Sequence, residues 1–140
     1  MKTGSSDSQW LERNIKWVLL LGVLGTAMMV AAAFASIAYM VMAAFRASDP
    51  YVHSLSAARG SEVVVAALGD PIHEGWLTTG SITSSSTSGT ASLAIPIAGP
   101  RGSATIYVEA RKSAGAWKYR DLLVELKPGG ERIDLLAADE

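Results

Sequence analysis

The chain of 140 residues has room for one domain of ordinary size, and its formal net charge of -1 provides no basic excess for a nucleic-acid groove. It contains no cysteine, which excludes disulfides, cysteine-ligated zinc, iron–sulfur clusters and thiol catalysis. Hydrophobic residues make up 49% of the sequence, a high share for a soluble protein, and most of the excess lies in one block near the N-terminus.

This block, residues 17–45, predicts a single transmembrane helix. It contains no Asp, Glu, Lys, Arg or His from Trp17 to Phe45, and roughly 20 apolar residues suffice to cross a bilayer. As a helix it would be roughly 44 Å long against a hydrocarbon core of roughly 30 Å, so we expect it to tilt or protrude. A cleaved secretory signal is the alternative, because Ala33-Phe34-Ala35 resembles a cleavage site. The apolar run continues past that site, which favours the anchor.

Residues 1–16 are then a cytoplasmic tail. Its basic residues only slightly outnumber those that follow the helix, so charge alone gives a weak orientation. Long domains that follow an anchor cross the membrane largely regardless of charge. We therefore expect the N-terminus in the cytoplasm and the domain on the other side.

Small residues recur along the apolar helix and predict a face for packing against another helix. These residues are Gly22, Thr26, Ala27, Ala31 and Ala35. The alternative is that alanine is simply common in membrane helices.

Residues 46–140 predict a soluble α+β domain that begins with a helix over 50–68. Asp49 is the expected N-cap, because its carboxylate accepts hydrogen bonds from free backbone amides, and Pro50 suits the first helical position. Gly69 suits a left-handed cap at the end of the helix, and Pro71 prevents its continuation.

After Gly75 the spacing of apolar residues changes from the helical period to the period of two that is typical of strands, and turn residues recur about every eight to twelve positions. This predicts an antiparallel meander over 76–136 of about five strands: 76–83, 90–98, 104–111, 117–126 and 132–136. The helix is the available cover for one sheet face, which makes the fold α+β. Pro96 would remove a ladder hydrogen bond from an internal strand, so we expect a bulge or an edge beside it.

The sequence contains no motif that brings potential metal ligands, nucleophiles or acid–base residues together. His53 and His73 have no cysteine or soluble-domain methionine pattern beside them, and the serine-rich stretch 84–88 contains no nucleophile elbow. Asp70 and Glu74 flank Pro71, but a loop of this kind is usually well solvated. We therefore expect no catalytic residue, no metal and no cofactor.

A surface remains as the candidate functional feature. Aromatic residues of a second sheet face and the neighbouring loop predict a partner-binding surface. It comprises Asp70, Pro71, Ile72, His73, Trp76, Tyr107, Trp117 and Tyr119. The alternative is that Trp76, Trp117 and Tyr119 belong to the core.

A series of short motifs in order carries a resemblance to a known family. They are Ala66-Ala67-Leu68-Gly69-Asp70-Pro71-Ile72, Gly75-Trp76, Gly80-Ser81-Ile82, Gly89-Thr90-Ala91, Ile95-Pro96-Ile97, Gly99-Pro100-Arg101-Gly102, Val108-Glu109-Ala110, Gly115-Ala116-Trp117, Leu122-Leu123-Val124 and Ile133-Asp134-Leu135-Leu136. Together they resemble the cytochrome c oxidase assembly factor 1 family over nearly the whole soluble domain. The anchor-plus-domain layout also resembles a small subunit of the mitochondrial presequence translocase.

The resemblance implies a membrane-anchored, non-enzymatic factor that assists maturation of a respiratory oxidase by protein–protein interaction. The alternative is an accessory subunit of a protein translocase that binds translocating chains; an enzyme is disfavoured by the missing constellations. Asp7 and Glu12 interrupt the acid-free composition expected of a mitochondrial targeting segment. We therefore expect a bacterial inner membrane with the domain in the periplasm, or the mitochondrial inner membrane in a eukaryote.

Overall fold

The computed structural model describes residues 5–137, and the chain falls into two compact units, Met1–Val41 and Met42–Glu140. The first unit is formed by helix α1, which runs over Ser5–Arg46 and so reaches into the second unit. The helix therefore extends beyond the predicted span 17–45 and includes part of the tail.

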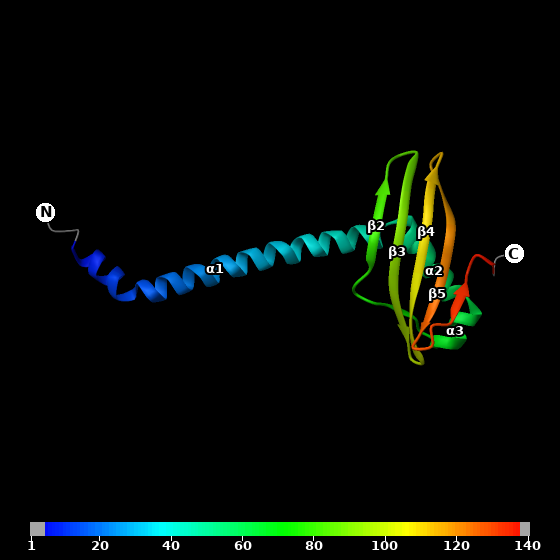
Figure 1. The fold of residues 1–140 in the computed structure, drawn as a ribbon, viewed down its shortest axis with the longest axis horizontal. Helices are drawn as coiled ribbons and strands as arrows, with labels where there is room; N and C mark the ends of the chain where they lie inside the picture. The colour runs from blue at the N-terminus through cyan, green and yellow to red at the C-terminus, as the bar shows by residue number, and fades with distance from the viewer. Residues whose placement is uncertain (1–4, 138–140) are drawn as a thin grey trace. The chain divides into compact units, whose positions relative to one another are not determined.

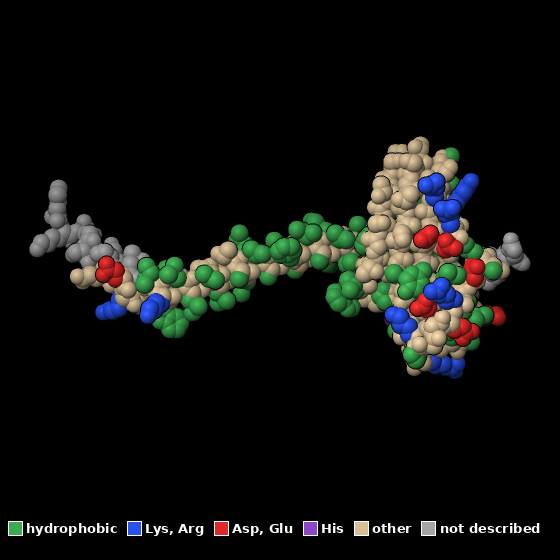
Figure 2. All heavy atoms as spheres, in the orientation of Figure 1, with side chains coloured by type: hydrophobic (Ala, Val, Ile, Leu, Met, Phe, Trp, Pro, Cys, Tyr) green, Lys and Arg blue, Asp and Glu red, His purple; other side chains and the backbone are tan. Residues whose placement is uncertain are grey.

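Helix α1 has the length and composition of a membrane span over Glu12–Arg46, with a mean hydropathy of 2.3 and none of its most apolar window buried. Figure 2 shows hydrophobic side chains along the middle of this helix, whereas charged side chains lie at its start and on the domain. A helix that is apolar on all sides and not buried in the protein suits a lipid environment, because in water its apolar side chains would stay exposed to solvent. The helix is thus compatible with membrane anchoring.

Two helices, α2 (Asp49–Gly60) and α3 (Glu62–Leu68), replace the single predicted helix over 50–68. Ser61 separates them, because its backbone is extended and its hydroxyl accepts a hydrogen bond from the amide of Val64 at 3.5 Å, which caps α3.

The ends of this helical segment match the predictions in part. The expected N-cap at Asp49 is wrong: Ser48 holds that position, its side chain makes no capping bond, and Asp49 lies in the first turn of α2. Gly69 ends α3 as predicted, but with φ 83° and ψ 170° it lies outside the left-handed helical region that was expected, in a conformation that glycine adopts without steric cost.

The α+β fold class is confirmed. The strands are β1 (His73–Glu74), β2 (Thr79–Ser84), β3 (Ser88–Gly99), β4 (Gly102–Ser113), β5 (Ala116–Lys127) and β6 (Arg132–Asp134). All pairs are antiparallel, in the order β1-β3-β4-β5-β6, and β2 also pairs with β3. The predicted first strand over 76–83 begins later, at Thr79, as β2, and the short strand β1 pairs with the same neighbour before it. In Figure 1, α2 and α3 lie behind this sheet.

The core lies between one face of the sheet and the two short helices. Alternate residues of β3, β4 and β5 point into it, as the period of two predicts. The buried side chains include Leu93, Ile95, Ile97, Ile106, Val108, Leu122 and Val124 from the sheet and Tyr51, Leu55, Ala58, Val64 and Leu68 from the helices.

The environment of Pro96 confirms that its strand has a local irregularity. Strand β1 pairs with β3 up to Ile97, β2 starts pairing at Ala94, and the Gly75 amide donates to the Pro96 carbonyl at 2.7 Å. Because the N and C=O of one residue point to the same side in an antiparallel strand, the missing N–H of Pro96 also faces this interrupted edge. No hydrogen bond to β4 is lost.

Candidate functional site

The loop between α3 and β2 is attached to the helices through one arginine. The Arg59 side chain donates from Nε to the Ile72 carbonyl at 3.1 Å and from a terminal nitrogen to Glu74 Oε2 at 2.7 Å. Ile72 is buried in the core, whereas Asp70, Pro71 and His73 are exposed. The sequence contained no signal for the pair of Arg59 and Glu74, because the two residues are far apart along the chain.

The pKa of Glu74 is lowered from its ordinary value of 4.5 by a hydrogen bond from its own backbone amide, against a smaller opposing effect of burial. The positive charges of Arg59 and Arg46 lower the pKa further. Glu74 therefore stays ionised in the folded domain to a lower pH than in the unfolded chain.

A lowered folded-state pKa stabilises the fold above the ordinary pKa of 4.5, and this stabilisation is lost as the pH falls through the folded value. We expect Glu74→Gln to reduce stability at neutral pH by less than about 1 kcal/mol, because the pair is partly exposed. Urea titrations at several pH values should show that the difference in unfolding free energy between wild type and Glu74→Gln becomes smaller as the pH falls.

Arg59→Gln should give a similar loss of stability, and combining the two substitutions should add little to it. If wild type and Glu74→Gln lost stability equally on acidification, this role of Glu74 would be contradicted.

The sheet face away from the helices is uncovered and carries part of the predicted surface. Tyr107 is 41% exposed there and lies between Ala94 and Leu123 of the neighbouring strands. We call Ala94, Pro96, Tyr107 and Leu123 the uncovered-face patch; Thr105 lies on the same face but is buried, at 7% exposure. His73 pairs with Ala98 and belongs to the same face by alternation.

Trp117 and Tyr119 lie on the other face, beside the helices. The register of β4 and β5 shifts between Glu109 and Ala110, so that Ala110 pairs with Tyr119 and Lys112 with Trp117. Such a bulge moves the following side chains to the opposite face. The structure therefore separates these two aromatics from Tyr107, although strict alternation would place all three together.

Tyr119 is half-buried against the core, and its ring stacks on His53 of α2 with centroids 4.3 Å apart. Burial raises the pKa of Tyr119, and the negative charge of Asp49 raises it further. Trp117 is also half-buried, with the Lys112 ammonium 5.9 Å from its ring centroid. The core alternative thus holds for Tyr119, but it is wrong for Trp76, which is 78% exposed.

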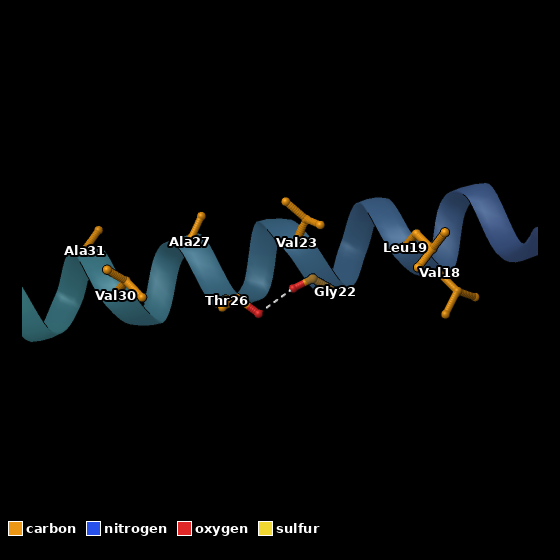
Figure 3. Close-up of a pocket in the computed structure, with 8 residues that line it drawn as sticks. All are labelled: Val18, Leu19, Gly22, Val23, Thr26, Ala27, Val30 and Ala31. Carbon is orange, nitrogen blue, oxygen red and sulfur yellow. Dashed lines mark hydrogen bonds between the residues drawn. The ribbon is translucent and has the colours of Figure 1, made fainter.

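Helix α1 carries a shallow groove at most of the predicted packing residues. It is lined by Val18, Leu19, Gly22, Val23, Thr26, Ala27, Val30 and Ala31. Figure 3 shows the Thr26 hydroxyl turned back to the Gly22 carbonyl, a hydrogen bond of 2.9 Å that satisfies the hydroxyl within the helix. Ala35 does not line this groove. Small side chains between larger ones leave room for a neighbouring helix.

Among residues 5–137, no three His, Cys, Asp or Glu side chains lie close enough to hold a metal ion. The features that stand out are surfaces: the uncovered-face patch, the loop tied to Arg59, and the groove of α1. This layout defines a small α+β domain attached to a candidate membrane helix.

The family model described as cytochrome oxidase complex assembly protein 1 matches residues 23–137. The chain belongs to this family, which confirms the resemblance found in the motifs and supports a role in cytochrome oxidase assembly. The comparison with curated proteins found no match, and neither did the comparison with solved structures.

Proposed function

We propose that this chain is a membrane-anchored, non-enzymatic factor that assists the maturation of a respiratory complex of the cytochrome oxidase type through protein–protein contacts. The observation that carries the proposal is the family match over residues 23–137, which includes most of the apolar run and nearly all of the domain. The unburied apolar helix over Glu12–Arg46 supports the anchor. The bacterial inner membrane, with the tail in the cytoplasm and the domain in the periplasm, is the proposed location.

Two surfaces are proposed to contact the oxidase subunits. The uncovered-face patch offers an exposed tyrosine among small and aliphatic side chains, a composition suited to a protein interface. His73 and the exposed residues Asp70 and Pro71 would contribute at its margin. The groove of α1 would accept a membrane helix of the partner, because its Gly22 and Ala27 permit close approach.

Affinity capture of the full chain from mild detergent tests this function. We expect oxidase subunits in the captured material, and we expect Tyr107→Asp to reduce their recovery about tenfold, since a central aromatic contact is commonly worth more than about 1.4 kcal/mol. Val63→Asp is the matched control, because Val63 is 58% exposed on α3 and lies outside the patch. Gly22→Leu tests the groove in the same assay.

Capture of translocase subunits without oxidase subunits would replace the assembly role by the translocase alternative. Recovery that is equally reduced by Tyr107→Asp and Val63→Asp would show that the patch is not the contact. Retained recovery for Gly22→Leu would remove the groove from the interface.

A further inference from the structure

Two exposed apolar side chains of the domain are adjacent in the chain, between β1 and β2. Gly75 is bonded to Pro96 and Thr79 pairs with Ala94, so the three residues 76–78 face the single residue Ile95. Thr78 is buried, whereas Trp76 is 78% exposed and Leu77 is 46% exposed. We call residues 76–78 the Trp76 bulge. Its geometry turns a tryptophan and a leucine outward, which has a hydrophobic cost in water unless something covers them.

The Trp76 bulge begins two residues after Glu74, which lies close to the end of the apolar run. Glu74 lines one pocket together with Arg46, Val52 and Arg59. Arg46 is the first charged residue after the apolar run, and it belongs to the same compact unit as the bulge. Phe45 packs against the domain core, which holds this end of the helix on the domain. Val52, on the same pocket, is a further exposed apolar residue at 55%.

We propose that Trp76 and Leu77 insert into the headgroup region of the bilayer that α1 crosses and form a second membrane contact of the domain. The inference rests on the proposed anchor. The first charged residue after an apolar span lies at the level of the headgroups, so Arg46 marks that depth. Tryptophan favours this level because its ring is apolar and its N–H needs a polar partner. Two contacts hold the domain in one orientation, and thus fix where its uncovered face points.

The bilayer suits this site better than a protein partner does. Trp76 and Leu77 are exposed in a loop that begins just after Glu74, and Glu74 shares a pocket with Arg46 and Arg59. Exposed apolar side chains on a part of the domain that also carries arginines match the mixed apolar and phosphate chemistry of the headgroup region. The uncovered-face patch, in contrast, presents its aromatic side chain within a sheet surface.

Nitroxide labelling tests the proposal, since the chain has no cysteine and each label is therefore unique. The full chain with Leu77→Cys is labelled and reconstituted into phosphatidylethanolamine–phosphatidylglycerol vesicles. Electron paramagnetic resonance then compares the accessibility of the label to oxygen, which enriches in lipid, with that to a water-soluble nickel complex. We expect a several-fold higher ratio at position 77 than for Ser86→Cys, which lies at an exposed polar hairpin tip roughly 26 Å along β3 from the bulge.

Trp76→Ser combined with Leu77→Cys should lower the ratio at position 77 toward that of the Ser86→Cys label. A label at Trp76→Cys provides a second probe if Leu77→Cys does not fold, because Trp76 is more exposed. Met28→Cys, within the apolar run and outside the groove, reports on the anchor itself. If position 28 lies in lipid while position 77 behaves like position 86, the second contact is overturned and the anchor stands. If position 28 is also in water, both are overturned.

Discussion

Ile106→Ala is expected to destabilise the domain by about 3 kcal/mol, the commonly measured loss for a fully buried isoleucine. Ile106 is fully buried in β4, and Ile95 and Val124 lie opposite it on the two neighbouring strands. Truncation removes apolar contacts and leaves a cavity that paired strands on both sides cannot close. Small proteins are stable by roughly 0.05–0.15 kcal/mol per residue, so this single change removes a large part of the stability.

Urea unfolding of the full chain in detergent, followed by circular dichroism of the sheet, measures the effect. Tyr107→Ala is the matched control, because it removes a larger side chain from the next position on the uncovered face, where it is 41% exposed. We expect the control to lose less than about 1 kcal/mol. Equal losses would show that the helices do not cover the face that contains Ile106.

Gly99→Val is the second large effect, and we expect a loss of about 3 kcal/mol from overpacking against atoms that cannot turn away. A β-carbon at Gly99 would clash with the Leu68 carbonyl oxygen and lie 2.9 Å from the Gly69 carbonyl oxygen. Both oxygens belong to the backbone at the end of α3. The adjacent Arg101 amide donates to the same Leu68 carbonyl at 2.8 Å, which ties the β3–β4 turn to this helix end.

The same unfolding measurement compares Gly99→Val with Gly129→Val, which places the same side chain in a turn with open space around it. We expect the control to change stability by less than about 0.5 kcal/mol. Gly99→Ala should fall between the two, because it adds only the clashing β-carbon. A stable Gly99→Val variant would mean that α3 does not pack on the β3–β4 turn.

Local patterns in the sequence determined the apolar helix, the α+β class and most of the strands. The alternation of apolar and polar residues over 104–111 indicates that Ile106 points inward and Tyr107 outward, because successive side chains of a strand point to opposite faces, and the structure agrees. Gly69 ends the helical segment as predicted, because glycine is the residue that adopts a positive φ most readily and can therefore be recognised as a helix end from the sequence. The small residues of α1 were also recognisable, because a helix brings positions four apart together.

Tertiary structure decided the features that depend on pairing between distant segments. The register shift beside Ala110 moves Trp117 and Tyr119 to the helix side, so the predicted aromatic surface is divided between two faces.

The Trp76 bulge exists because two short strands share β3 on either side of Pro96, and Arg59 reaches Glu74 only once α2 lies against that edge. A hydrophobic repeat of two residues for a strand, or of 3.6 for a helix, describes a single segment of the sequence. A bulge or an ion pair between distant residues depends instead on how two segments are aligned in the fold.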